Sequence, residues 1–237
     1  MVDKNLVADL NKQADALNLV GMLEKVSSNF PGKVVFTTSL GIEDQVVTDM
    51  IFSNNLDISI VTLDTGRLFE ETYKVLNRTM EKYRIQIQSY FPKNEPVEKM
   101  ITQKGPLSFY LSLENRKECC RIRKVEPLGR ALAGKECWIT GLRASQSENR
   151  HDLDFFVWDA GFKLIKFNPL LRWSLEECQE YVKKNNVPYN VLHDRGFMSI
   201  GCAPCTRAIQ PGEDFRAGRW WWENNSEKEC GLHTHQK

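Results

Sequence analysis

Two short apolar segments, each followed by a polar turn and a helical pattern, constrain the fold most strongly. Residues 33–38 (KVVFTT) have the composition of a buried strand, and the chain turns at 39–41 before it continues with helical spacing. Residues 58–64 (ISIVTLD) repeat this arrangement, because a Thr-Gly turn leads into a helix expected over 68–83. Strands that alternate with helices predict an α/β fold with a parallel sheet, whose ligand crevice lies at the carboxyl ends of the strands.

Three further strands extend this pattern through most of the chain. They are expected at 85–91, 137–143 and 162–170. Ser174 then begins a helix, and Glu177 stands where it completes a capping box.

The C-terminal part of the sequence has a different character. Beyond about residue 200 the chain is rich in Gly, Pro, Arg and Trp and has no sustained hydrophobic period. We therefore expect an α/β domain over residues 1–200 and a functional C-terminal segment over 201–237, which ends in a mobile tail.

Charge and hydropathy exclude several classes of protein. The 237-residue chain has 32 Lys and Arg against 31 Asp and Glu, a formal net charge of +1, so no overall field attracts nucleic acid or an acidic membrane. No apolar run approaches the ~18 residues of a membrane span, and residues 1–21 lack the apolar centre of a signal peptide. We expect a cytoplasmic protein with neither nucleic-acid nor membrane partners. Its oligomeric state, including association of identical chains, stays open.

Four of the seven cysteines form two close pairs, Cys119 with Cys120 and Cys202 with Cys205. In a reducing cytoplasm such a set indicates metal binding or redox chemistry rather than disulfides. Four thiolates suit a zinc ion or a 4Fe-4S cluster. Adjacent cysteines favour the cluster, because neighbouring side chains on a helix diverge and a four-iron cube offers separate corners.

The cysteines also admit a simpler interpretation. The first pair could be small buried side chains and the second a lone redox pair, but the basic surroundings KECCRIRK make simple burial unfavourable. Cys137 and Cys178 lie in an apolar strand and an amphipathic helix, so we expect both to serve packing.

The two cysteine pairs occur together with the loop SLGIED (39–44), the turn LDTG (63–66) and the tail KECGLH (228–233). On these motifs the chain resembles the assimilatory sulfonucleotide reductases. More narrowly, the chain is similar to their iron-sulfur branch, the adenylylsulfate (APS) reductases, from about residue 33 to residue 233. The resemblance implies an adenine nucleotide alpha hydrolase-like (PP-loop) fold, with residues 1–200 as the nucleotide-binding domain. It also implies a 4Fe-4S cluster, held by Cys119, Cys120, Cys202 and Cys205.

The reaction that this resemblance implies is reduction of adenylylsulfate by thioredoxin. The products are sulfite, AMP and oxidised thioredoxin, in assimilatory sulfate reduction and cysteine biosynthesis. Whether glutaredoxin replaces thioredoxin stays open. We expect the cluster to have a structural and electrostatic role, while electron transfer also stays open.

The predicted substrate-binding residues lie at strand ends and in basic segments. The loop at 38–44 joins a strand to a helix, where free backbone N–H groups attract an anion, and Gly41 allows close approach. It lacks the consecutive glycines of related ATP-cleaving enzymes, which argues against use of ATP. Arginine suits a phosphosulfate because its planar fork binds two anion oxygens. By resemblance, the set is Ser39, Gly41, Asp64, Lys124, Gly141, Arg143, Arg150, Arg216 and Arg219.

Cys230 is the catalytic nucleophile that the resemblance implies. A free thiol with a pKa near ~8.5 is only slightly ionised at neutral pH, and Glu227 and Glu229 oppose ionisation further. We therefore expect activation when the tail docks near the arginines. Attack on the sulfate sulfur would leave an S-sulfocysteine, which thioredoxin then reduces. His233 is not included in the catalytic set.

Two other functions are compatible with parts of this sequence. A phosphoadenylylsulfate (PAPS) reductase would share the reaction, but that branch typically lacks the four cluster cysteines. A zinc-bound nucleic-acid interaction module on the same fold is the other, and the balanced charge disfavours it.

Overall fold

The computed structural model describes residues 4–146 and 153–223. These residues form two compact units. The first comprises residues 4–62, 74–88, 132–146 and 153–190, and the second comprises 63–73, 89–131 and 191–223. The domain boundary expected near residue 200 stays a prediction.

A six-stranded sheet of order β3-β2-β1-β4-β6-β5 runs through the described part of the chain. Strand β1 pairs in parallel with β2 and β4, and β4 pairs in parallel with β6. Central strands of this kind are buried on both faces, and Phe36 of β1 stands between Ile60 and Ile139 in register. The expected parallel α/β sheet is confirmed. The strands are β1 Val34–Thr38, β2 Ser59–Leu63, β3 Gln88–Tyr90, β4 Cys137–Ile139, β5 Phe156–Asp159 and β6 Leu164–Phe167.

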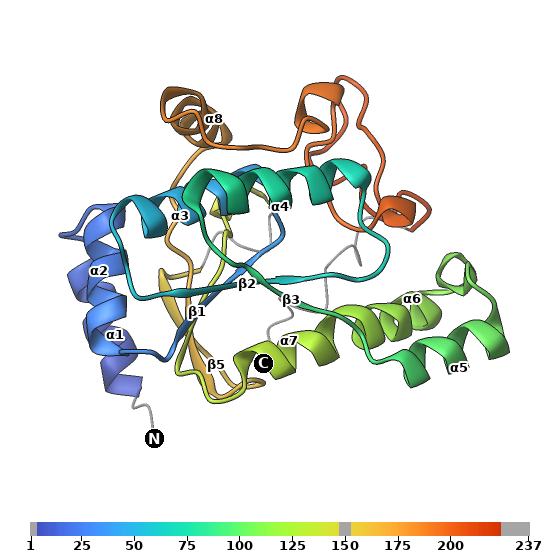
Figure 1. Cartoon of the computed structure of the whole chain (residues 1–237), viewed down its shortest axis with the longest axis horizontal. Coiled ribbons are helices and arrows are strands. Elements are labelled where there is room, and N and C mark those ends of the chain that lie inside the picture. The colour runs from blue at the N-terminus through green and yellow to red at the C-terminus, as the bar shows by residue number, and fades with distance from the viewer. Residues whose placement is uncertain (1–3, 147–152, 224–237) are drawn as a thin grey trace. The chain divides into compact units, whose positions relative to one another are not determined.

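Eight α-helices and several single turns connect these strands in the described residues (Figure 1). The capping box expected at Ser174 and Glu177 is present at the start of α8. The helices are α1 Lys4–Ala14, α2 Leu19–Asn29, α3 Ile42–Ser53, α4 Glu70–Tyr83, α5 Asn94–Lys104, α6 Leu113–Cys120, α7 Glu126–Leu132 and α8 Leu175–Lys184. A π-helical turn, η2 Arg121–Val125, joins α6 to α7, and the turns η1 Ser108–Tyr110, η3 Ala144–Gln146, η5 His193–Arg195 and η6 Ala203–Cys205 are 3-10 helices.

Strand β5 was not predicted, and it differs from its neighbours in pairing antiparallel with β6. It joins the sheet because Phe156 stacks on Phe167, with ring centroids 4.2 Å apart. Helix α1 covers this edge. The Asn11 amide donates to the Phe156 carbonyl at 2.8 Å and accepts from the Phe156 N–H at 2.9 Å, so a side chain satisfies backbone groups of the edge strand.

Helix α3 of the first unit is buried along almost its whole length. Its apolar residues join the hydrophobic core beside the sheet strands, and α8 packs against it (Figure 1). The same helix also buries acidic residues. Asp49 accepts hydrogen bonds from the hydroxyls of Tyr83 at 2.5 Å and Tyr181 at 2.8 Å, which provides the partners that a buried carboxylate needs.

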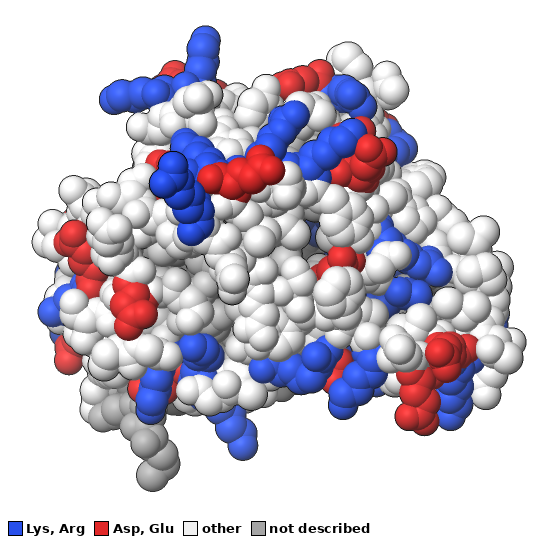
Figure 2. Space-filling view, viewed as in Figure 1, with Lys and Arg blue, Asp and Glu red and all other residues white. Residues whose placement is uncertain are grey.

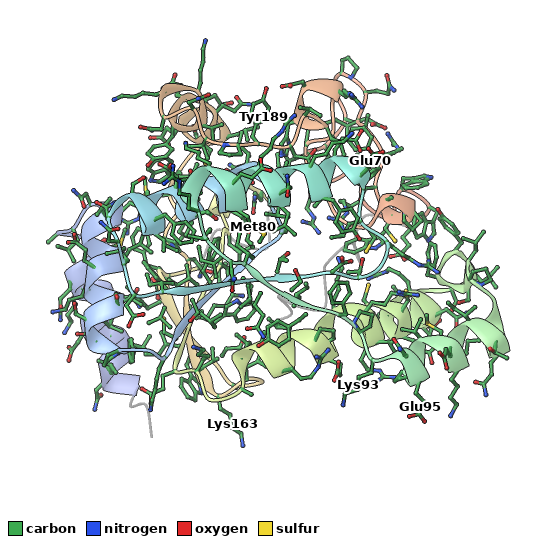
Figure 3. The ribbon with its side chains drawn as sticks, viewed as in Figure 1. Glu70, Met80, Lys93, Glu95, Lys163 and Tyr189 are labelled. Carbon is green, nitrogen blue, oxygen red and sulfur yellow. The ribbon has the colours of Figure 1, made fainter. Side chains whose placement is uncertain are left out.

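The second unit has a smaller core between α5, α6 and the C-terminal stretch. Met100, Phe109, Cys119 and Ile122 are buried there, with Cys205 among the residues packed around them. Figure 1 shows α5 and α6 side by side, and an ion pair joins Lys104 to Glu118 at 2.7 Å. Lys93 and Glu95, at the start of α5, project outward (Figure 3), and Lys93 Nζ lies 3.4 Å from Glu126 Oε1.

Charged side chains are mixed on the molecular surface. On the face in Figure 2, Lys and Arg alternate with Asp and Glu and leave large uncharged areas. Among the described helices, none is both long and apolar enough to cross a membrane.

Candidate active site

The loop after β1 takes an unusual backbone conformation at Leu40. This buried residue has a φ of 63°, in the left-handed region that bulky side chains rarely adopt. Gly41, which was expected to allow close approach of an anion, has a φ of −73° and a ψ of 169°, which any residue can adopt. A Cβ at Gly41 would meet other atoms only at ordinary distances of 3.5 Å or more. Strain in this loop is therefore located at Leu40, a position that the sequence pattern does not single out.

Asp44, in the first turn of α3, holds this loop together. Its Oδ2 accepts hydrogen bonds from the Ser39 N–H at 2.5 Å and the Ser39 hydroxyl at 2.6 Å. Its Oδ1 lies against Gly141, where a Cβ would stand only 2.0 Å away. Burial, partly opposed by the Ser39 hydrogen bonds, raises the pKa of Asp44 to about 7. The predicted residues Ser39 and Gly141 are thus brought together by a carboxylate that was not predicted.

Arg143 forms a buried ion pair with Glu43. The Nε of Arg143 donates to Glu43 Oε1 at 2.9 Å, and both side chains are almost completely shielded from solvent. Gln146 donates to the same oxygen at 3.0 Å, and Arg143 also donates to the Ser145 hydroxyl at 2.6 Å. Adjacent acidic residues of α3 therefore organise the loops after β1 and β4. The predicted role of Arg143 in substrate binding stays a prediction.

In the second unit, the turn after β2 is closed by Asp64. Its Oδ1 accepts from the Gly66 N–H at 2.8 Å and from the Tyr73 hydroxyl at 3.0 Å. Gly66 has a φ of 70°, so glycine is required at this position. Burial and the neighbouring Asp64 raise the pKa of Tyr73 to about 12, which keeps this hydroxyl a proton donor.

The four paired cysteines come together in the second unit. Electrostatic interactions connect Cys119 with Cys202, Cys202 with Cys205, and Cys205 with Cys120. Cys119 and Cys120 end α6, whereas Cys202 precedes the turn η6 and Cys205 is its last residue. The two sequence pairs therefore meet in the fold, as a shared cofactor requires. Their role as ligands stays a prediction.

The turn after β2 also contacts this cysteine group. The Thr65 hydroxyl lies 3.2 Å from Cys202 Sγ, and the Thr65 carbonyl accepts from Arg123 Nη1 at 2.6 Å. The Ala203 N–H donates to the Arg67 carbonyl at 2.8 Å. Thr65, Arg67 and Arg123 were not in the predicted set, although the LDTG motif and the basic run after Cys120 were their signals in the sequence.

Positive charge alters the acidity of these thiols unequally. Burial opposes ionisation of Cys202, but Lys124, the Thr65 hydroxyl and Arg219 outweigh it and lower its pKa. Burial and the charge of Cys202 together raise the pKa of Cys205 to about 12. Cys137 and Cys178 lie in the core of the first unit with no solvent exposure, so their expected packing role is confirmed. Burial raises the pKa of both thiols.

Several buried donors around this group point to an anionic ligand. The Nε–H groups of Arg123 and Arg219 and the indole N–H of Trp220 are buried and have no hydrogen-bond acceptor among the described residues. These groups donate and cannot accept, so they require an acceptor such as a cluster sulfur or an oxyanion. Arg219 is held in place because it crosses Gly201, where a Cβ would lie 2.5 Å from its guanidinium.

Trp220 lies beside two of the predicted arginines, Arg216 and Arg219. The guanidinium of Arg219 is 4.7 Å from its ring centroid and that of Arg216 is 5.9 Å away. Trp220 has a φ of 43°, a second left-handed backbone at a bulky buried residue.

Some of the predicted features fall outside what the structure can place. Arg150 and Cys230 lie outside the described residues. Among the described residues, no three His, Cys, Asp or Glu side chains form a group that could hold a metal ion. A single ion and a four-iron cube make different demands, because the cube's ligands bind separate irons and need not converge on one point.

Comparison with known proteins identifies the family. Residues 33–208 match the phosphoadenosine phosphosulfate reductase domain. This chain belongs to that family. The matched range includes both cysteine pairs, the two strand-end loops and Lys124, whereas Arg216, Arg219 and Cys230 lie beyond it.

Curated relatives within the reductase family cover nearly the whole chain. The adenosine 5'-phosphosulfate reductase of Rhizobium meliloti (strain 1021) is 51% identical over 224 residues, which are 94% of this chain and 84% of the relative. The protein of the same name from Neisseria meningitidis serogroup B is 50% identical over 199 residues, which are 84% of this chain and 81% of the relative.

Solved structures agree with the reductase fold. Phosphoadenylyl-sulfate (PAPS) reductase from Candida auris, in a phosphate complex, superimposes with a TM-score of 0.75 at 28% identity and covers 88% of this chain and 98% of its own. FMN adenylyltransferase from Candida glabrata has a TM-score of 0.56 at 13% identity and covers 94% of this chain and 76% of its own, which shows a shared fold alone. The expected adenine nucleotide alpha hydrolase-like architecture is confirmed.

Proposed function

We propose that this protein reduces adenylylsulfate to sulfite and AMP, with Cys230 as the nucleophile and a thioredoxin-type dithiol protein as the reductant. Relatives of about 50% identity that match most of the chain are named adenosine 5'-phosphosulfate reductase. The observation that carries the proposal is the group of buried donors and cations beside the paired cysteines, which is built to receive an anion.

The 4Fe-4S cluster would be held by Cys119, Cys120, Cys202 and Cys205. The residues present fit such a group, because the four thiols gather from two segments and the buried N–H groups of Arg123 and Trp220 need acceptors. When bound, the cluster would supply a fixed charge distribution and cross-link the C-terminal stretch to α6.

The proposed chemistry has two balanced steps. The Cys230 thiolate attacks the sulfate sulfur, so a sulfur–sulfur bond forms while the bond from sulfur to the AMP phosphate oxygen breaks and AMP leaves with the electron pair. A reduced protein thiol then attacks Cys230 Sγ and releases sulfite, and its second thiol resolves the mixed disulfide. Two thiols are thereby oxidised to a disulfide, and the sulfate sulfur is reduced to sulfite.

The cations of this chain assist the first step. Arg216 and Arg219 would bind the phosphosulfate and Lys124 would stabilise the developing negative charge near the cysteine group. Arg143 and Arg150 are proposed to hold the phosphosulfate together with these two arginines. Ser39, Asp64 and Gly141 are proposed to line the nucleotide pocket, and Gly41 to allow close approach of the anion. We place the reaction in the cytoplasm, where thiols stay reduced.

Metal content and turnover test this proposal. Anaerobically purified protein should contain about four irons per chain, and Cys202→Ser should remove iron and colour. Cys137→Ser is the matched control, because that thiol lies in the first unit's core and should leave iron content unchanged.

Turnover separates the substrates and the nucleophile. Adenylylsulfate should be reduced with thioredoxin faster than phosphoadenylylsulfate, and the reverse order would indicate a PAPS reductase. Cys230→Ser should keep iron and AMP binding but release no sulfite. Sulfite release by that variant would remove Cys230 from the mechanism.

A further inference from the structure

Arg116 lies one helical turn before Cys120, on the same face of α6. Residues four apart on a helix are neighbours, and the Arg116 side chain hydrogen-bonds the Cys120 side chain. The Arg116 side chain is only 2% exposed, so this contact is shielded from water. Arg116 was not among the predicted site residues, although the motif KECC begins directly after it.

A carboxylate fixes the orientation of this arginine. Arg116 Nε donates to Glu223 Oε1 at 2.7 Å, and its Nη2 donates to Glu223 Oε2 at 2.9 Å. The Arg116 Cζ lies 4.5 Å from the centroid of the Trp220 ring. The two hydrogen bonds and the ring contact hold the planar guanidinium in one orientation, in which it also reaches Cys120.

The segment that carries the second cysteine pair holds Glu223 in turn. The Glu223 N–H donates to the Trp220 carbonyl at 2.9 Å, and the Trp220 N–H donates to the Cys205 carbonyl at 3.3 Å. All of these residues belong to the second unit. One arginine and its carboxylate therefore connect a cysteine of the first pair to the backbone of the second pair.

Two other ion pairs of the second unit show what is particular about Arg116. Lys104 binds Glu118 of α6 at 2.7 Å, and Arg207 binds Glu213 through two hydrogen bonds of 2.8 Å. Their side chains are between 31% and 41% exposed, so water competes for their charges. A shielded arginine acts more strongly on a neighbouring thiolate, because the surrounding dielectric constant is low.

We propose that Arg116 and Glu223 are positioning residues for Cys120 as a ligand of the cluster. Glu223 orients Arg116, and Arg116 donates to the Cys120 sulfur and holds that thiolate in the orientation of a ligand. Carboxylates that orient ligating histidines at metal sites act in the same way, and their loss typically costs about 10–100-fold in metal affinity. This inference rests on the proposed function, because it needs the cluster on the paired cysteines.

Iron retention by Glu223→Gln is the first test. This change keeps the shape of the side chain, removes its charge and turns one acceptor into a donor that faces Arg116. Anaerobically purified protein should release iron to the chelator ferrozine at least about tenfold faster than the wild-type protein. Lys104→Gln and Glu213→Gln, at the two exposed pairs, are the matched controls and should release iron at the wild-type rate. Release at that same rate from Glu223→Gln would overturn the proposal.

The order in which the cysteines are freed separates positioning from a merely structural role. While the bound cluster is oxidised, brief pulses of N-ethylmaleimide would label each thiol as it is freed, and mass spectrometry would locate the label. In Glu223→Gln, Cys120 should be labelled first, because its donor is disturbed while the Thr65 hydroxyl still faces Cys202. If the pair only held the C-terminal stretch to α6, Cys202 and Cys205 would be labelled first. That order would refute a positioning role at Cys120.

A double variant removes the cost of a buried unpaired charge. Arg116→Met combined with Glu223→Gln leaves no arginine without its carboxylate, so resistance to urea should recover relative to Glu223→Gln alone. Iron release should stay fast, because Cys120 still lacks its donor. Recovery of iron retention together with stability would show a pair that serves stability alone and would contradict the inference.

The iron content of the wild-type protein separates this inference from the proposed function. If the wild-type protein held no iron, the cluster assignment would fail, and the positioning role would fail with it. If the wild-type protein held about four irons per chain and Glu223→Gln retained them equally well, only the positioning role would fail.

Discussion

Replacing Gly141 with alanine tests whether Asp44 links the loops after β1 and β4. The new Cβ would stand 2.0 Å from Asp44 Oδ1, which is much shorter than a van der Waals contact. The carboxylate must therefore move away from Ser39. At about pH 8 the carboxylate is ionised, and each of its two hydrogen bonds from Ser39 contributes about 1.5–3 kcal/mol. Removing conformational freedom from the unfolded chain offsets about 0.4–1 kcal/mol. We expect the free energy of unfolding to fall by about 2–5 kcal/mol.

A double-mutant cycle identifies the cause of this loss. In an Asp44→Ala background the clashing oxygen and the Cγ at 3.1 Å are both absent, and the backbone nitrogen of residue 44 remains at 3.3 Å. Gly141→Ala should then cost only about 1 kcal/mol, measured by urea unfolding with tryptophan fluorescence. Gly41→Ala is the control from the same site, and it should be neutral or stabilising by up to about 1 kcal/mol. An equal cost of Gly141→Ala in both backgrounds would refute the reasoning.

Three further predictions concern the first unit. The folded pKa of Asp44, about 7, lies above its ordinary value of 3.8, so the stability that its protonated form contributes is lost as pH rises from about 4 through 7. Asp44→Asn should flatten the pH dependence of urea unfolding in that window, and an unchanged profile would contradict the assignment. Glu43→Ala should lower the free energy of unfolding by about 3–5 kcal/mol because it leaves Arg143 buried without its carboxylate, whereas Asp15→Ala, at an exposed ion pair with Arg172, should cost at most about 1 kcal/mol. Asn11→Ala should lower the free energy of unfolding by about 1–3 kcal/mol, because it removes both hydrogen bonds to the edge strand. Asn77→Ala, at an exposed helix position, is the control and should lower it far less. Equal effects would show that α1 does not protect that edge.

Local signals predicted the framework of the fold. Buried parallel strands are continuous apolar runs, so β1 and β2 were found in place, and the capping box at Ser174 needs only residues three apart. Strand β5 was missed because it is short and depends on Phe167, eleven residues later, for its stacking partner. Its pairing depends on tertiary contacts, which the hydrophobic periodicity of the segment itself does not indicate.

The sequence predicted those parts of the site whose residue types and spacing indicate a particular chemistry. Cysteine pairs and strand-end loops indicate chemistry by spacing, and the structure brings both cysteine pairs to one place. Glu43 and Asp44 look like ordinary acidic residues in the first turn of a helix, where charge is normally solvated. Their burial arises from the loop after β4, about 100 residues away in sequence, and could not be read from the motif itself.

The π-helical turn between α6 and α7 has a consequence for how this segment can change during evolution. Pro127 has no N–H for the Arg123 carbonyl and its ring would clash there in a regular helix, which accounts for the wider turn over Arg121–Val125. Substitutions on the outer side of that turn leave its path intact. Loss or gain of a single residue would rotate everything beyond it by about 100° relative to Cys119 and Cys120. Among related sequences, insertions and deletions in this segment should therefore be much rarer than substitutions.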